Sequence, residues 1–195
     1  MSNPAPGALE TVRAFVNTLD VERGTDALED PGSAASWFAG QGLLGGAASI
    51  RASAADVRRA IELRAALRAH LDAHHGEPLD PQASTVLDAA ARRARLTVRF
   101  TGLDKTAAEP EAAGVDGALG RLLAIVKAAI DDGTWRRLKV CPAGDCRWAF
   151  YDESRNRSAT WCDMRVCGNR AKVRDFRQRT RPGSDAAEAS APERS

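Results

Sequence analysis

The four cysteines of this chain are the residues whose types and spacing best suit a chemical role. They form two C-x4-C pairs, Cys141 with Cys146 and Cys162 with Cys167. Four thiolates can surround a tetrahedral Zn²⁺ ion, whereas disulfide frameworks are typical of secreted chains. Because cysteine fills every ligand position, the set predicts a structural zinc site rather than a catalytic one. The alternative is a set of four reduced cysteines without a metal.

The residues around both pairs indicate how the sulfurs converge. Pro142 and Gly144 predict a tight turn between the first two cysteines, and residues 137–140 and 147–151 alternate like the strands of a β-hairpin. Residues 168–179 have a helical pattern that begins at the second pair. A zinc-holding hairpin followed by such a helix is treble-clef-like. We expect metal binding to supply much of the folding free energy of so short a module.

Basic residues are concentrated in the same part of the chain. Residues 135–182 hold 13 Lys and Arg against 5 Asp and Glu, a net charge of +8, whereas residues 1–134 have a net charge of −4. Arginine forks match phosphate oxygens, and phosphate contacts dominate the affinity of proteins for DNA. We therefore expect DNA as the partner of this module. The candidate contact residues are Arg155, Arg157, Asn169, Arg170, Lys172, Arg174 and Arg177.

The expected C-terminal helix has a basic face. Steps of four and three residues place Arg170, Arg174 and Arg177 on this face. Val173 and Phe176 fall on another face, and we expect them to pack against the hairpin. The helix would then present its arginines to a polyanion.

Other roles for these residues stay open. Asn169 and Arg170 have the chemistry to read adenine and guanine edges, but the asparagine can equally cap the helix, and arginines can compensate the charge of a zinc–thiolate cluster. Trp148 and Trp161 can stack on bases or form a small core beneath the metal. A zinc-stabilised protein-interaction adaptor and an RNA-binding module are therefore the alternative functions.

The cysteine module resembles the CGNR zinc-finger family, which is named for the motif found here at residues 167–170. The S-R-N-R-S stretch at 154–158 and the A-K-V-R-x-F stretch at 171–176 also match that family. In the family the finger follows a domain called ABATE, and F-V-N-T-L-D at 15–20 resembles the opening motif of that domain. The resemblance implies a stress-linked transcription regulator with a structural zinc ion.

The first 134 residues have mostly helical patterns, interrupted by one alternating segment at residues 95–101 that predicts a half-exposed strand. Ser53 and Asp56 have the spacing of a capping box, and Asp80 followed by Pro81 predicts a second helix start. The expected helices are residues 8–20, a short helix from Ser33, a long helix from Ser53 to Gly76, residues 80–94 and residues 116–132.

These patterns predict an α+β fold that is mostly helical. The N-terminal part is a helix-rich, ABATE-like domain with a small β element, and the C-terminal part is a treble-clef-like zinc finger. The expected divisions are the helix-rich domain at 1–134, the four-cysteine zinc finger at 135–180 and a disordered tail at 181–195 that lacks large apolar residues.

A helical domain joined to a DNA-binding finger often senses a small molecule. Asn17 and Asp20 are polar residues in the otherwise apolar helix expected at 8–20, and Trp37 can line a pocket, so these three are the candidate effector-binding residues. Helix caps and core aromatics are the alternative. His70 and His74 have an i, i+4 spacing that can bind a metal, but without a third ligand we expect a solvated helix face.

The remaining features exclude several classes of protein. A nucleophile elbow, a phosphate loop and a dinucleotide fingerprint are all missing, and the histidines lie far from the cysteines, so we expect no enzyme activity. No apolar run reaches the roughly 18 residues of a membrane helix, and residues 1–7 do not resemble a secretory signal. We therefore expect a regulator in the bacterial cytoplasm. We also expect it to form a homodimer, because DNA-binding proteins often pair, although no heptad pattern shows this.

Overall fold

The computed structural model of the protein describes residues 4–45 and 51–180. The tail at 181–195, expected to be disordered, lies outside the described residues. Within them the α-helices are α1 (Leu9–Val16), α2 (Pro31–Gly40), α3 (Ala54–Ala73), α4 (Pro81–Arg93), α5 (Gly114–Asp131) and α6 (Asn169–Thr180). Two further helical turns are η1 (Trp135–Arg137), of the 3-10 type, and η2 (Met164–Gly168), of the π type.

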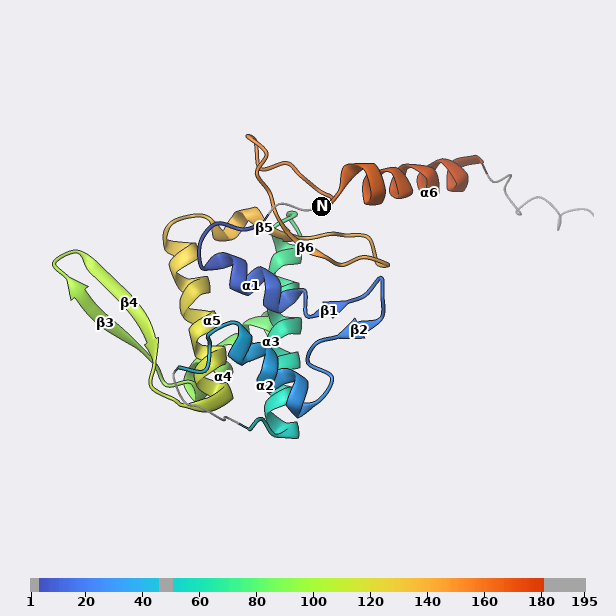
Figure 1. Ribbon diagram of the computed structural model, residues 1–195. Coiled ribbons are helices and arrows are strands. Elements are labelled where there is room, and N and C mark those ends of the chain that lie inside the picture. Colours follow the sequence, from blue (N-terminus) through green and yellow to red (C-terminus); the bar gives the residue numbers. More distant parts are fainter. Residues whose placement is uncertain (1–3, 46–50, 181–195) are drawn as a thin grey trace, which may run out of the picture.

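The described strands form three separate antiparallel hairpins (Figure 1). The strands are β1 (Leu19–Asp20) with β2 (Thr25–Asp26), β3 (Leu96–Gly102) with β4 (Lys105–Pro110), and β5 (Leu138–Val140) with β6 (Ala149–Tyr151). The mostly helical α+β class is confirmed, as are the strand at 95–101 and the hairpin around the first cysteine pair. Among the described helices, none combines the length and the apolar composition that crossing a membrane requires.

Local capping explains where the main helices begin. The predicted capping box is confirmed, because the Ser53 hydroxyl accepts from the Asp56 N–H while the Asp56 carboxylate accepts from the Ser53 N–H. Asp80 caps α4 as expected. The predicted start of α2 at Ser33 lies two residues beyond the observed start at Pro31. The carboxylate of Asp30 accepts from the N–H groups of Gly32 and Ser33 and so caps the helix.

The main apolar core lies between α1, α2, α3 and α5, and the β5–β6 hairpin completes it. The largest side chains with almost no exposed surface include Val12, Phe15, Phe38, Leu63, Leu67, Leu119, Leu122, Leu138 and Val140. The boundary expected at residue 134 therefore does not separate two cores, since residues on both sides of it share this one. The division of the chain into two folding units stays a prediction.

Polar side chains fasten both strands of the β5–β6 hairpin to the helices. The Asn17 amide donates to the Ala149 carbonyl (2.9 Å) and accepts from the Ala149 N–H (2.7 Å). On the other strand, ring nitrogens of His74 and His75 donate to the carbonyls of Leu138 and Val140, each at 2.7 Å. The histidines thus form part of the contact between α3 and β5.

The prediction that the helix face carrying His70 and His74 is solvated was wrong. Both rings are half-buried, and that of His74 packs edge-on against Trp135, with 5.4 Å between the ring centroids. Burial lowers the pKa of His74, although its hydrogen bond to Leu138 favours the charged form. A neutral ring that donates to a backbone carbonyl suits this position.

The β3–β4 hairpin projects from the body of the molecule (Figure 1). Its second strand, β4, was not among the elements expected from the sequence. The base of the hairpin is close to α5 at Gly120, where a Cβ atom would lie 2.6 Å from the Cβ atoms of both Ala94 and Pro110. Glycine at this position therefore allows the hairpin base to pack on the helix.

The paired hydrogen bonds of Asn17 predict a large stability effect. Asn17→Ala leaves the Ala149 N–H without its partner and the Ala149 carbonyl with only a long hydrogen bond from Arg13 at 3.5 Å. We therefore expect it to lower the free energy of unfolding by about 1–3 kcal/mol. Asn156→Ala, at an exposed loop position, is the control and should change it by less than about 0.5 kcal/mol. Urea unfolding of the zinc-loaded protein measures both, and equal effects would contradict the assigned role of Asn17.

Candidate metal centre and basic surface

The four cysteine sulfurs converge on one point. All four ligand atoms lie within 4.8 Å of one another, and the Sγ atom of Cys162 is 3.6 Å from that of Cys146 and 3.7 Å from that of Cys167. These separations are too long for a disulfide of about 2.05 Å. They match the spacing of about 3.8 Å between sulfurs that each lie about 2.3 Å from a tetrahedral zinc ion. The donor set therefore fits zinc, and the predicted ligands are brought together.

The β5–β6 hairpin positions the first pair. Cys141 follows β5 directly, and its N–H donates to the Trp148 carbonyl (2.9 Å), which extends the hairpin. The chain then turns so that Cys146 N–H donates to the Ala143 carbonyl (3.0 Å). Arg147 leaves this turn in the left-handed region, with φ of 55°. The turn thus brings the Cys146 sulfur close to the Cys141 sulfur.

The η2 turn positions the second pair. The side chain of Asp163 accepts from the Arg165 N–H (2.8 Å), and its carbonyl accepts from the Cys167 N–H (2.9 Å). Cys162 and Cys167 therefore lie at the two ends of one turn, and α6 begins just after it. Trp148 and Trp161 are half-buried against the sulfurs, in the position expected of a small core beneath the metal. The treble-clef assignment itself stays a prediction.

The pKa values of the thiols are shifted apart because the sulfurs lie so close together. Hydrogen bonds from Cys162 lower the pKa of Cys141 to about 5, and the Cys141 sulfur in turn raises the pKa of Cys162 far above its usual range. Burial raises the pKa of Cys167 to about 12. Four adjacent sulfurs cannot all carry charge unless a positive ion compensates them. A bound zinc ion supplies that charge and crosslinks the two pairs.

A buried ion pair fixes the loop between β6 and η2. The Lys139 ammonium lies 2.8 Å from the Asp152 carboxylate, and their side chains are 5% and 0% exposed. Lys139 also donates to the carbonyls of Arg157 (2.7 Å) and Ala159 (3.1 Å). Burial alone would raise the pKa of Asp152, but hydrogen bonds from Lys139 and Ser154 outweigh it and lower the pKa. The Lys139 ammonium therefore holds the loop 152–160 from the inside of the protein.

The sequence interpretation missed Lys139. Its only signal is a lysine between two apolar residues of a short strand, and alternation makes that position look exposed. Arg137 adds to the same support, since its guanidinium donates to the carbonyls of Asp152 (2.9 Å) and Ser154 (3.0 Å). Both side chains thus act on the conformation of the loop and not on a ligand.

The predicted nucleic-acid contacts lie on two neighbouring projections. Arg155 and Arg157 are exposed on loop 152–160, which rises from the body before the chain enters α6 (Figure 1). Arg157 has φ of 54°, a strained value for a residue with a side chain. We call the exposed cationic side chains that were predicted as nucleic-acid contacts the basic surface. Its members are Arg155, Arg157, Lys172, Arg174 and Arg177.

Arg170 and Asn169 are engaged within the protein. The Arg170 guanidinium forms ion pairs with Glu22 (3.0 Å) and Asp145 (3.4 Å), so it joins the start of α6 to the β1–β2 turn and to the cysteine turn. The Asn169 amide donates to the Arg165 carbonyl (3.0 Å) and thereby supports the helix start. Both residues that were expected to contact base edges thus make intramolecular contacts.

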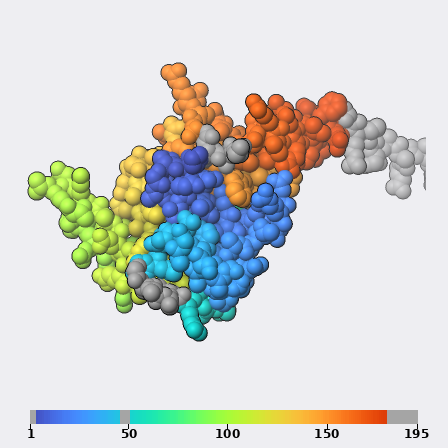
Figure 2. All heavy atoms as spheres, viewed as in Figure 1, coloured from blue at the N-terminus to red at the C-terminus, as the bar shows by residue number. Residues whose placement is uncertain are grey.

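The expectation that Val173 and Phe176 pack against the hairpin was wrong, since these side chains are 48% and 61% exposed. The apolar side of the hairpin is already covered by α1 and α3, so this side is not available to α6. Instead, α6 extends away from the body (Figure 2). Val173 lines an open groove of about 610 Å³ together with Arg165, Val166, Asn169, Arg170, Arg174 and Arg177.

Each of the three expected effector-binding residues makes a contact within the protein, and their role in binding an effector stays a prediction. Asn17 uses its amide on Ala149. The carboxylate of Asp20 accepts from the Arg23 N–H at 3.0 Å. The ring of Trp37 packs against Phe15, with 5.6 Å between the ring centroids. Trp37 thus packs as a core aromatic, which was the alternative interpretation of this residue. Asn17 binds the backbone of the hairpin.

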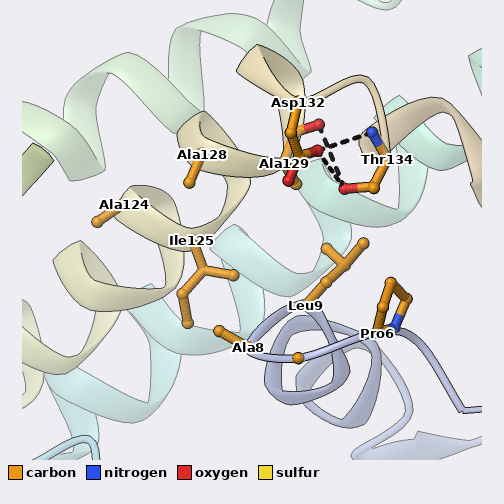
Figure 3. Close-up of a pocket in the computed structure, with 10 residues that line it drawn as sticks. Pro6, Ala8, Leu9, Ala124, Ile125, Ala128, Ala129, Asp132 and Thr134 are labelled. Atoms are coloured by element: carbon orange, nitrogen blue, oxygen red, sulfur yellow. Dashed lines mark hydrogen bonds between the residues drawn. The ribbon is translucent and has the colours of Figure 1, made fainter. Parts of the chain in front are cut away.

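An apolar cavity of about 470 Å³ lies elsewhere, between the start of α1 and the end of α5 (Figure 3). Its lining is mostly aliphatic and includes Leu9 and Ile125. The polar groups at its rim, Asp132 and Thr134, are bonded to each other, with Thr134 Oγ1 donating to the carboxylate at 2.6 Å. Ligand sites need polar groups that fix orientation, so this cavity offers little selectivity, and the small-molecule effector stays a prediction.

We expect the protein to contain one zinc ion per chain when purified under reducing conditions, as measured by elemental analysis. A chelator should remove hydrogen-exchange protection from residues 162–180, because without the metal only exposed ion pairs, such as that of Arg170 with Asp145, join them to the first cysteine pair. It should leave α3 and α5 protected, because their core lies apart from the sulfurs. Full protection of residues 162–180 without the metal would contradict a structural role for zinc.

Lys139→Met should lower the free energy of unfolding by about 3–5 kcal/mol, because it leaves the Asp152 carboxylate buried without its ion. Lys172→Met removes the same charge from an exposed position of α6 and should have an effect below about 0.5 kcal/mol. Urea unfolding of the zinc-loaded protein compares the two variants. A Lys139 effect no larger than that of Lys172 would show that the buried pair does not stabilise the loop.

Comparison with known families agrees with this architecture. Residues 137–180 match the CGNR zinc finger, and residues 9–132 match ABATE, described as a "putative stress-induced transcription regulator". No curated protein matches the chain. The zinc-finger match and the four converging sulfurs together identify the metal as zinc. Since the ABATE match alone spans more than half of the 195 residues, the chain belongs to the ABATE family and carries a C-terminal CGNR zinc finger.

Proposed function

We propose that this protein is a DNA-binding transcription regulator whose basic surface contacts the phosphate backbone. The observation that carries the proposal is the exposure of Lys172, Arg174 and Arg177 on a helix that extends from the body. Within α6 five cationic residues accompany a single acidic one, Asp175. A helix of this kind suits a groove of the duplex, where phosphates flank it on both sides. Such a function belongs in the cytoplasm, where bacterial DNA lies.

The loop 152–160 adds a second contact region to the proposed interface. Its arginines at 155 and 157 are exposed, while the loop backbone is held by Lys139 and Arg137. Cations held on a fixed backbone lose less conformational entropy when they bind than cations on a mobile loop. A rigid loop next to a projecting helix can therefore contact two stretches of the same backbone.

The ion pairs of Arg170 set a limit on its role in this proposal. Glu22 and Asp145 occupy its guanidinium, so a phosphate would have to displace a carboxylate to reach it. Arg174 also reaches the Asp145 carboxylate, but at 4.0 Å and with its side chain 48% exposed. We therefore assign direct contacts to the exposed cations and a positioning role to Arg170. Because Glu22 belongs to the N-terminal part, this contact also links that part to the start of α6.

Salt dependence tests the proposal. Neutralising three to five phosphates predicts a slope of log K against log salt of about −3 to −4 for a random duplex. Arg174→Ala with Arg177→Ala should weaken binding and make the slope shallower by about 2, without loss of zinc. The matched control is Arg92→Ala with Arg93→Ala, which removes two exposed arginines at the end of α4 and should leave the slope unchanged. Fluorescence anisotropy measures the binding.

The other outcomes separate the alternative functions. A flat slope, or no binding of duplex at low salt, would overturn the proposal and favour the protein-interaction adaptor. The exposed apolar side chains of Val173 and Phe176 are consistent with that alternative. Preference for single-stranded RNA over duplex DNA at equal salt would favour the RNA-binding module. Selection from a random DNA pool by the zinc-loaded protein would then identify the preferred sequence.

A further inference from the structure

The β3–β4 hairpin has one apolar and one polar face. Leu96, Val98 and Phe100 alternate along β3 and share a face, and Val98 and Phe100 lie opposite Ala108 and Thr106 on β4. The other face carries charged residues, including the ion pair between Arg99 and Glu109 at 3.6 Å. The hairpin is thus amphipathic like a strand pair that covers a core.

Only the base of that apolar face is covered. Leu96 packs against the main core, but exposure then rises along the strand to 59% for Val98 and 85% for Phe100. A two-stranded hairpin is at best marginally stable in water, and independent stability needs three or more strands with a hydrophobic face. The outer part of the hairpin therefore lacks the partner that its pattern requires.

The edge of β3 is the place where further strands can be added. In the described part of the chain, β3 and β4 form a sheet of two strands. The β4 strand lies beside α5, and β3 is the outer strand in Figure 1. An exposed edge strand presents unpaired backbone groups that can pair with another chain. The sequence of β3, L-T-V-R-F-T-G, is rich in residues that favour strands.

The arginines at 95 and 99 favour one register for pairing β3 with the same strand of a second copy. An antiparallel pairing centred on Val98 of both copies sets Leu96 opposite Phe100 and Thr97 opposite Arg99. Centring it one residue earlier would set Arg95 opposite Arg99, and one residue later would set Arg99 opposite Arg99. Like charges directly across a strand pair are destabilising. The Val98 register alone among these three avoids them and keeps both apolar faces on one side of the sheet.

We propose that two copies of this chain dimerise by antiparallel pairing of their β3 strands about a two-fold axis between the two Val98 residues. The resulting four-stranded sheet, in the order β4–β3–β3–β4, has a continuous apolar face and reaches the strand number that a stable sheet needs. Isologous pairing of this kind is the commonest form of oligomer symmetry. Residues 95–111 carry three basic and three acidic side chains, so the hairpin has no net charge to attract a polyanion.

The dimer would leave the basic surface accessible. The hairpin and α6 project from opposite sides of the body (Figure 1), so pairing through β3 does not cover the zinc finger. Dimerisation is therefore independent of the proposed DNA binding, and each can fail without the other. A test without DNA keeps the two separate.

The test measures the mass of the full-length, zinc-loaded protein without DNA, by sedimentation equilibrium over a concentration series. Wild type should be dimeric. Val98→Lys places two cations at the two-fold axis and should raise the dimer dissociation constant at least 100-fold. Val98→Ile adds a methylene to each copy at the same position and should lower it about tenfold. The Ile variant keeps the test sensitive if the Lys variant folds poorly.

Leu103→Lys is the matched control. It removes an exposed apolar residue of the same hairpin (104% exposed) from the turn, outside the paired strands, and should change the dissociation constant less than threefold. A wild-type protein that stays monomeric at 100-fold the concentration used for DNA binding would overturn the proposal. So would equal weakening by the Val98 and Leu103 substitutions, because that result would indicate apolar contact through the tip and not strand pairing.

Discussion

The structure depends on the β5–β6 hairpin belonging to two clusters at once. Its strands complete the helical core, with Leu138, Val140 and Ala149 buried among the helices, while the turn between them carries Cys141 and Cys146 of the separate sulfur cluster. A zinc module of this size has too little apolar surface to be stable alone. Here half of its metal ligands are mounted on a hairpin that the larger domain already holds. The metal then has to organise only the segment that follows loop 152–160.

The same arrangement explains why α6 is so exposed. In a free-standing finger the apolar side of the hairpin would be available for the helix, but here α1 and α3 occupy it. What holds the start of α6 is Cys167, the Asp163 turn and the ion pairs of Arg170. A short isolated helix is marginal in water, and Val173 remains half exposed. The outer turns of α6 therefore gain most from a partner, and their side chains are mainly cationic. An intermolecular role for the helix follows from the lack of an intramolecular one.

Local patterns predicted the elements and the metal ligands well, and contacts between elements poorly. The spacing of the cysteines, the Ser53 capping box and the alternation at 95–101 depend on near neighbours in the chain, so each could be recognised. Asn17, His74 and Lys139 bond to backbone groups of distant segments. Any polar residue can do this once the fold brings a carbonyl within reach, so no sequence pattern marks it. The error about Val173 and Phe176 has the same origin, since helical periodicity cannot reveal that another element already covers the hairpin.

The buried ion pair of Lys139 and Asp152 occupies a position where apolar side chains could also pack. Replacing a buried ion pair by apolar residues is often neutral or stabilising, so stability alone does not account for Lys139. Its ammonium binds one carboxylate and two carbonyls, of Arg157 and Ala159, and the first carbonyl belongs to a residue with a left-handed φ of 54°. No apolar side chain could satisfy those carbonyls or hold that strained backbone. The ion pair therefore fixes a loop shape in which Arg155 and Arg157 point to solvent, and this specificity, rather than added stability, is what the buried charge supplies.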